Sequence, residues 1–155
     1  MQEAAHEPHH LRYMQRCLAL AQRAANNQEV PVGAIIVRGK DIIAEASNQP
    51  IGRCDPTAHA EICCIREAAA HCNNYRLTGC VLYSSIEPCL MCAGAIMHAR
   101  LDKVVFGAPE PRGGAISGNV NYFEALSHLH KIEVIGNVLA DDCRQLMQDF
   151  FRARR

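Results

Sequence analysis

Two short segments of metal-binding side chains constrain this sequence more than any other feature. The first is HAE, from His59 to Glu61, and the second is PCLMC, from Pro88 to Cys92. Imidazole nitrogen and cysteine thiolate are ligands that zinc prefers in proteins. If both segments bind one ion, the fold has to bring together two parts of the chain that are distant in sequence.

The two cysteines of the second segment have the spacing of one helical turn. Cys89 and Cys92 are three positions apart, so on a helix they lie on one face and can both reach one ion. Pro88 is typical of a helix start, which puts Cys89 near the helix N-terminus. The positive end of the helix dipole favours thiolate, the form that binds a metal.

His59 also stands at the start of a predicted helix. It follows DPT, in which Asp55 or Thr57 can cap that helix, and it precedes a run rich in Ala and Ile. His59, Cys89 and Cys92 then supply one nitrogen and two sulfur ligands. Three protein ligands leave the fourth corner of a tetrahedral zinc site to water, which is typical of catalytic rather than structural sites.

Glu61 is the candidate catalytic residue. It lies two residues after His59 and projects from the same helix start, where it can stand beside the metal without binding it. Two thiolates neutralise the charge of Zn²⁺, so a bound water is acidified less than in a site of three histidines. A neighbouring carboxylate that takes the proton is therefore useful.

The sequence leaves two other interpretations of these residues open. Cys63 lies four residues after His59, and with Cys89 and Cys92 the pair would form a closed structural zinc site. Alternatively, Cys89 and Cys92 form a redox-active pair, which leaves His59 and Glu61 without a role. The helix-start positions favour the open site, because Cys63 falls one turn deeper among apolar residues.

The order of the hydrophobic patterns predicts an α/β fold. Strands alternate with helices, so we expect a three-layer α/β/α arrangement around a central mixed sheet of five strands. No linker or repeat divides the chain, and residues 1–155 are predicted to form a single domain. The expected elements are, in order, a helix at 10–27, a β-hairpin at 30–48, a helix from 58, a strand at 80–85, a helix at 89–98, a strand at 103–108, a loop at 109–119, a helix at 122–127, a strand at 131–135 and a helix at 140–152.

Composition narrows the cellular setting. Nine cysteines, an odd number, follow a start that lacks the apolar stretch of a secretion signal, which favours free or metal-bound thiols in the cytoplasm. No apolar run approaches the roughly 20 residues that a membrane span needs.

Sixteen basic and sixteen acidic residues balance, so a nucleic-acid contact has to come from a local patch. The candidate patch is Arg152, Arg154 and Arg155, although a solvated helix end would show the same residues.

Several segments resemble one known family. HAE with PCLMC matches the H-x-E and P-C-x-x-C signature of zinc-dependent nucleobase deaminases. Longer stretches are similar to bacterial tRNA-specific adenosine deaminases, namely EVPVGAIIV, DPTAHAEI, EPCLMCAGAIMHARL, VVFGA and DFFRARR. The resemblance implies a cytidine deaminase-like fold and a homodimer. It also implies a reaction, the hydrolytic conversion of adenosine to inosine at the wobble position of a tRNA anticodon stem-loop. The implied substrate is an arginine tRNA.

The resemblance also implies roles for individual residues. His59, Cys89 and Cys92 match the ligands of one zinc ion per subunit, and Glu61 matches the proton shuttle. The implied substrate contacts are Asn48, Val30, the backbone of Ala60, Ile86, Glu110, Phe151 and Arg152. A target base flipped out of its stack suits this chemistry, because water has to reach C6 of the adenine.

The sequence departs from the family pattern in its loops. Pro109 and Glu110 stand where a basic residue and an aspartate are usual, and Leu129 stands where asparagine is common. We therefore expect different RNA contacts in these loops and the same reaction. Two alternative functions stay open, a deaminase of a free base, nucleoside or nucleotide in the same fold, and a non-catalytic RNA-binding domain with a closed zinc site.

Overall fold

A mixed five-stranded sheet forms the centre of the fold, as the sequence predicts. This computed structural model describes residues 2–154. The sheet has the order β2-β1-β3-β4-β5, with antiparallel pairing from β2 to β3 and parallel pairing from β3 to β5. The strands are β1 (Gly33–Arg38), β2 (Asp41–Ser47), β3 (Cys80–Ile86), β4 (Lys103–Ala108) and β5 (Glu133–Ile135).

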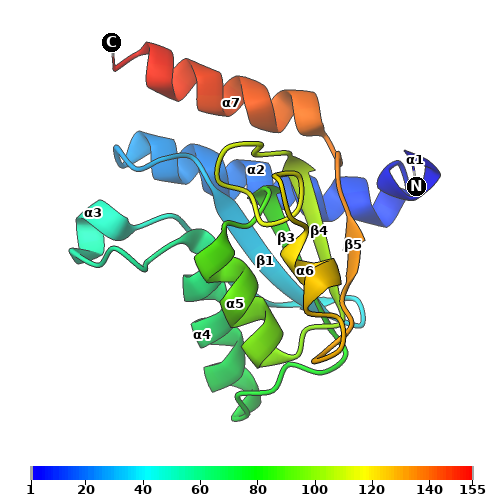
Figure 1. The fold of residues 1–155 in the computed structure, drawn as a ribbon. Coiled ribbons are helices and arrows are strands. Elements are labelled where there is room, and N and C mark those ends of the chain that lie inside the picture. The colour runs from blue at the N-terminus through cyan, green and yellow to red at the C-terminus, as the bar shows by residue number, and fades with distance from the viewer. Residues whose placement is uncertain (1, 155) are drawn as a thin grey trace.

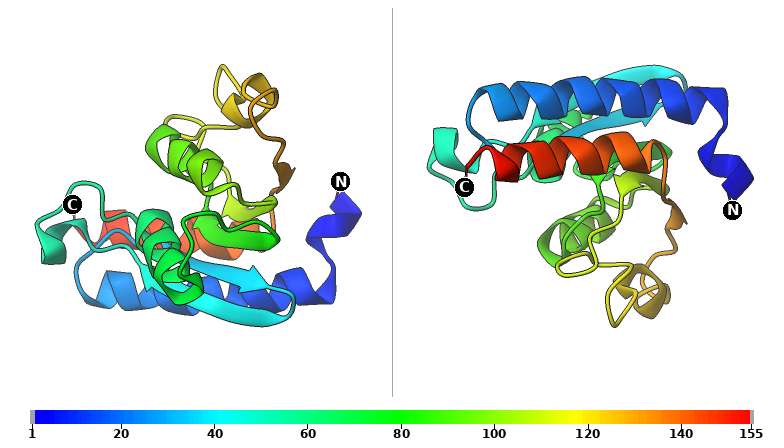
Figure 2. Two further views of the ribbon diagram at one scale, coloured as in Figure 1. Left: turned by 90° about the horizontal axis from the view of Figure 1, so that it is seen from below. Right: turned by 90° about the horizontal axis from the view of Figure 1, so that it is seen from above.

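Helices cover both faces of the sheet and complete the predicted three layers (Figure 1). One face is covered by α2 (Pro8–Asn26) and α7 (Ala140–Arg152), which lie side by side when the molecule is seen from above (Figure 2). The opposite face is covered by α4 (Ala60–Cys72), α5 (Leu90–Ala99) and the short α6 (Tyr122–Ala125).

The alternation of side chains in β1 explains why the core has two halves. Ala34 and Ile36 belong to the apolar cluster under α4 and α5, whereas Ile35 and Val37 belong to the cluster under α2. Successive side chains of a strand point to opposite faces. A strand covered on both faces therefore needs the unbroken apolar run that the sequence shows here.

Two short helices were not predicted from the sequence, α1 (Gln2–Ala5) and α3 (Pro50–Arg53). Each has four residues, which is too few to show the 3.6-residue period that identifies a helix. The helix α3 begins at a proline, whose fixed φ suits the first turn. It matters for the site because it precedes the loop that leads to His59.

Parallel pairing of β3 with β4 determines where the site forms. The carboxyl ends of parallel strands lie at the same edge of a sheet, where ligands bind in open α/β sheets. Ile86 ends β3 and leads to Cys89, while Ala108 ends β4 and leads to the predicted loop at 109–119.

Among residues 2–154, no helix is long and apolar enough to cross a membrane.

Replacing Gly33 with alanine should destabilise the protein. A Cβ at Gly33 would overlap the backbone of α2 at Cys17 and Ala21, so helix and strand would have to separate. We expect Gly33→Ala to lower the free energy of unfolding by about 2 kcal/mol, measured by urea denaturation. Gly94, inside α5, has open space around it, and Gly94→Ala should raise the same quantity by about 0.5 kcal/mol. Equal effects of the two substitutions would contradict the packing of α2 on β1.

Candidate metal centre

Two helix N-termini present the predicted metal ligands. His59 is the N-cap residue of α4, and Cys89 is the N-cap residue of α5. Neither side chain makes a capping hydrogen bond, so both are available to a ligand. The proposed caps were wrong, because Asp55 instead accepts hydrogen bonds from the Thr57 N–H at 2.9 Å and the Thr57 hydroxyl at 2.7 Å. These bonds order the turn that delivers His59.

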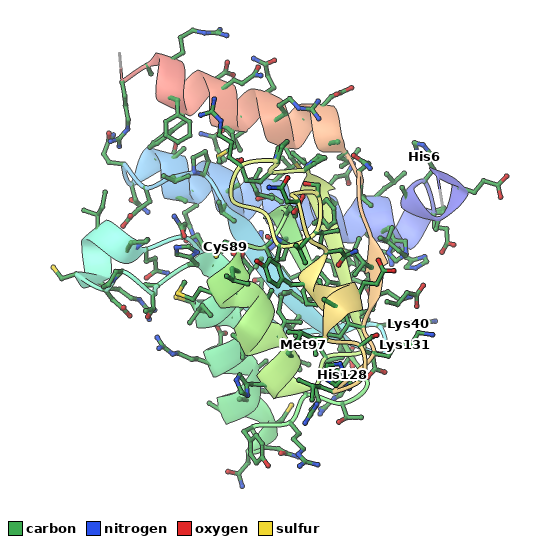
Figure 3. The ribbon with its side chains drawn as sticks, viewed as in Figure 1. His6, Lys40, Cys89, Met97, His128 and Lys131 are labelled. Carbon is green, nitrogen blue, oxygen red and sulfur yellow. The ribbon has the colours of Figure 1, made fainter. Side chains whose placement is uncertain are left out.

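The structure brings the ligand group, His59, Cys89 and Cys92, to one point. The Nδ1 atom of His59 lies 3.7 Å from Sγ of Cys89 and 3.5 Å from Sγ of Cys92, and the three atoms all lie within 4.8 Å of one another. Zinc–nitrogen bonds of about 2.0 Å and zinc–sulfur bonds of about 2.3 Å in a tetrahedron put nitrogen and sulfur about 3.5 Å apart. The observed spacing therefore fits zinc without rearrangement. Figure 3 shows Cys89 at the start of α5, with Met97 further along the same helix.

The two thiols differ in acidity because they share a hydrogen bond. The bond from the Cys92 thiol, followed by one from His59, lowers the pKa of Cys89 to about 4, although burial opposes the shift. The same bond to Cys89 raises the pKa of Cys92, and burial raises it further. The shared bond thus favours a thiolate at Cys89, and a bound divalent cation would favour a second thiolate at Cys92.

Glu61 lies beside the ligand group without belonging to it. Its side chain is 4% exposed in the first turn of α4. Burial raises the pKa of Glu61, while hydrogen bonds from its own N–H and from the Cys92 thiol work in the opposite direction. The site therefore combines three metal ligands, one imidazole and two thiol groups, with one buried carboxyl group.

Cys63 does not complete a closed site. In the part of the chain that the structure describes, the ligand group contains only one histidine and two cysteines, and Cys63 packs instead in the apolar cluster under α4. Burial raises the pKa of the Cys63 thiol, which opposes the thiolate that a metal requires. The structure favours the open site, and the contact of His59 with both cysteines makes a simple redox pair a poor description.

A second set of possible ligands has an ordinary explanation. Glu7, His9 and His10 gather at the start of α2. The carboxylate of Glu7 lies 3.4 Å from Nε2 of His9 on the protein surface, and buried His10 is hydrogen-bonded through Nδ1 to the Tyr83 hydroxyl at 2.8 Å. A surface contact beside a histidine that already has a hydrogen-bond partner does not indicate a second metal centre.

Four of the predicted substrate contacts line one cavity. Ile86, Glu110, Phe151 and Arg152 lie in the wall of a cavity of about 690 Å³, formed by the ends of β3 and β4, the loop after β4, and α7. The same wall carries three further arginines, Arg112, Arg144 and Arg154. The ligand group is not part of this wall, but Ile86 is three residues before Cys89 and links the cavity to the metal centre.

The remaining predicted contacts lie near a second cavity or the metal. Asn48 is 8% exposed and lines a cavity of about 420 Å³ with Glu29. Val30 follows Glu29, and the Asn48 N–H donates to the Val32 carbonyl at 3.0 Å, which holds this segment against Asn48. Ala60 is fully buried as the first residue of α4. Arg155, the last residue of the candidate basic patch, lies outside the described part of the chain.

Two buried carboxylates were missed by the sequence reasoning. Glu29 accepts hydrogen bonds from the N–H groups of Ile51 at 3.0 Å and Gly52 at 2.7 Å, which fixes α3 ahead of the His59 loop. Glu87 accepts bonds from the loop at 109–119. A signal was present in each case, since one acid directly precedes the run VPVGAII and the other separates a buried strand from Pro88.

Comparison with known proteins defines the family. A family model for the cytidine and deoxycytidylate deaminase zinc-binding region matches residues 7–108. The tRNA-specific adenosine deaminase of Haemophilus influenzae is 44% identical over 92% of this chain and 83% of its own length. This chain belongs to the tRNA-specific adenosine deaminase family.

Solved structures of a tRNA:A34 deaminase and of a guanine deaminase share the fold of this chain. A structure from a study of A-to-I editing by tRNA:A34 deaminases at the wobble position of transfer RNA is 36% identical, with a TM-score of 0.84 over 87% of this chain and 98% of that chain. A guanine deaminase from Bacillus subtilis is 39% identical, with a TM-score of 0.63 over 75% of this chain and 74% of that chain. The cytidine deaminase-like fold is thereby confirmed. The matched zinc-binding region and the ligand group together identify zinc as the cofactor.

Removing one ligand should remove the metal from this deaminase. We expect Cys92→Ala to lower the zinc content from about one ion per chain to below about 0.1, measured by atomic emission on protein dialysed against a chelator, because two ligands cannot hold the ion. Cys63→Ala is the matched control, since it removes a neighbouring thiol and should leave zinc bound. Zinc loss in the Cys63 variant with retention in the Cys92 variant would reverse the assignment of the site.

Proposed function

We propose that this protein is a hydrolase that converts adenosine at the wobble position of a tRNA anticodon to inosine. The observation that carries the proposal is the open ligand group with a buried carboxyl group, Glu61, at its side. A structural zinc site is closed by four protein ligands, whereas a catalytic one leaves a position for water. The position of this carboxyl group supports proton transfer next to the metal.

The residues supply the proton movements of a hydrolytic deamination. When bound, zinc would act as a Lewis acid that makes water a better nucleophile at neutral pH. Glu61 takes a proton from the water that attacks C6 of the purine and delivers it to N1. A second proton passes through Glu61 to the exocyclic amino group, which leaves as ammonia while C6 becomes a carbonyl carbon. A buried carboxyl group suits this role, because its raised pKa lets it hold the proton between the two steps.

We assign recognition of the base to residues around the metal centre. The Asn48 side-chain amide can bond to the edge of the purine, and the Ala60 N–H is one of the first amide groups of a helix, which lack intrahelical partners. Val30 and Ile86 would form apolar walls for the ring. Their positions near the second cavity and at the end of β3 support these roles.

We assign the RNA strand to the arginine-lined cavity beside α7. Phe151 is 46% exposed there, and aromatic side chains stack on unpaired bases. Exposed Arg152 can pair with phosphate, at the cost of a 3.8 Å ion pair with Asp149. Arg154 contributes less in this arrangement, because it donates to the Gln28 carbonyl at 2.7 Å.

The tRNA substrate is supported by the relatives rather than by the metal centre. The Haemophilus influenzae relative is named for tRNA-specific adenosine deamination, and an arginine tRNA is our choice among tRNAs. We further propose a homodimer acting in the cytoplasm, which sedimentation equilibrium and fractionation can test. Exposed Leu90 and Val120, which line one further cavity, support contact with a second copy.

Substitution of Glu61 should separate catalysis from metal binding. We expect Glu61→Gln to lower the rate of inosine formation in an anticodon stem-loop by at least about a thousandfold with zinc still bound, because the amide cannot transfer the proton. Glu67→Gln, on the same helix but exposed to solvent, is the matched control. Ammonia release from guanine, adenosine or cytidine, without any inosine in the stem-loop, would instead identify a deaminase of free bases or nucleosides.

Substitution of Arg152 should weaken RNA binding without affecting the metal. We expect Arg152→Ala to raise the Kd for the stem-loop by about tenfold and to reduce the slope of log K against log salt by about one, measured by fluorescence anisotropy. Arg76→Ala, at the loop after α4, is the control and should change neither quantity. An unchanged salt slope in the Arg152 variant would contradict a phosphate contact at α7.

A further inference from the structure

Glu87 is a buried acidic residue that the proposed chemistry does not use. Its side chain is 3% exposed. It lies between Ile86, in the wall of the arginine-lined cavity, and Pro88, which precedes the zinc ligand Cys89. Burial of an acidic side chain is costly unless hydrogen bonds compensate for it, so its partners indicate what it does.

Among the residues that the structure describes, the four side-chain hydrogen bonds of Glu87 all come from the loop at 109–119. Oε1 accepts the Glu110 N–H at 3.1 Å and the Ser117 hydroxyl. Oε2 accepts the N–H groups of Ile116 at 2.9 Å and Ser117 at 3.0 Å. A carboxylate offers about four acceptor positions and no donor, so this loop fills its capacity.

The loop is shaped to receive this carboxylate. A side chain at Gly114 would overlap the Glu87 carboxylate, so only glycine allows the approach. The Gly114 N–H donates to the Glu110 carbonyl at 2.7 Å, and the Gly114 backbone forms an isolated β-bridge with Cys89. Glu110 is therefore held at its N–H by Glu87 and at its carbonyl by a residue that also touches the metal-binding segment.

We propose that Glu87 is a positioning residue for substrate, which holds the Glu110 loop in register with the zinc-binding segment. The inference rests on the proposed function, in which Glu110 contacts the RNA. Glu110 lines the cavity with Phe151, and its own carboxylate accepts the Arg112 N–H at 3.1 Å, so the direction of its side chain follows the loop backbone. Glu87 thus fixes the position of the loop relative to both the cavity wall, through Glu110, and the metal ligand Cys89, through Gly114.

Glu87→Gln tests this role with little change in volume. The Gln amide group can replace Oε1 because the Ser117 hydroxyl can turn to accept from it, and the loss then falls on the Glu110 N–H. We expect kcat/KM for the stem-loop to drop by about tenfold, with zinc content and Tm close to those of the wild type. Ser117→Ala is the matched control, since it removes one bond to the same carboxylate and leaves the Glu110 N–H bound. It should cost less than about threefold.

A double-mutant cycle distinguishes positioning from a general structural role. If Glu87 acts through Glu110, then adding Glu87→Gln to Glu110→Ala should cause no further loss of kcat/KM. Additive losses, loss of zinc together with activity, or wild-type activity in Glu87→Gln would each overturn the proposal.

Amide hydrogen exchange gives a readout that does not depend on activity. The Glu110 amide should exchange at least about tenfold faster in Glu87→Gln than in the wild type or in Ser117→Ala, because its acceptor is gone. Unchanged exchange would overturn the proposal whatever the activity. A wild-type protein that leaves the stem-loop unmodified would contradict the proposed function instead, and the exchange rates would still decide whether Glu87 holds the loop.

Discussion

The site depends on the parallel pairing of β3 with β4. Because the two strands run in the same direction, both end at the same edge of the sheet, and the segments that follow them start there. The chain leaving β3 forms the start of α5 with Cys89 and Cys92, and the chain leaving β4 forms the loop with Glu110. The start of α4 packs next to α5 and adds His59. Antiparallel pairing would send the loop to the opposite edge, and the metal would then lie far from the arginine-lined cavity.

Three buried carboxyl groups near this edge show how hydrogen bonding separates structural from chemical roles. Glu29 accepts N–H groups from α3, and Glu87 accepts four donors from the loop at 109–119. Acceptor positions filled by fixed backbone donors hold a carboxylate and its partners in place. Glu61 has a different environment, in which burial is the largest influence and raises its pKa. A carboxyl group whose charged form is disfavoured in this way is suited to carrying a proton.

The metal centre was predictable from the sequence to an unusual degree. His59, Cys89 and Cys92 have ligand chemistry and helix-start spacing that can be interpreted without a fold, and the structure brings their donor atoms to zinc distances. The capping role assigned to Asp55 or Thr57 was wrong, because a polar residue before a helix can order the preceding turn as readily as the helix itself. The four-residue helices α1 and α3 were missed because they show no complete hydrophobic period.

The sequence by itself determined the order of the strands and of the helices other than the four-residue α1 and α3, the ligand types and the two helix starts at the metal, since these follow from local spacing and from chemistry carried by single residues. Tertiary structure alone decided that Cys63 packs in the core rather than at the metal. His59 and Cys63 are four residues apart and share one helix face, so helical spacing is compatible with either location for the Cys63 thiol. It also decided which acids hold loops. Glu29 and Glu87 acquire their partners from residues more than twenty positions away, and a hydrogen bond of that kind leaves no periodic pattern in the sequence.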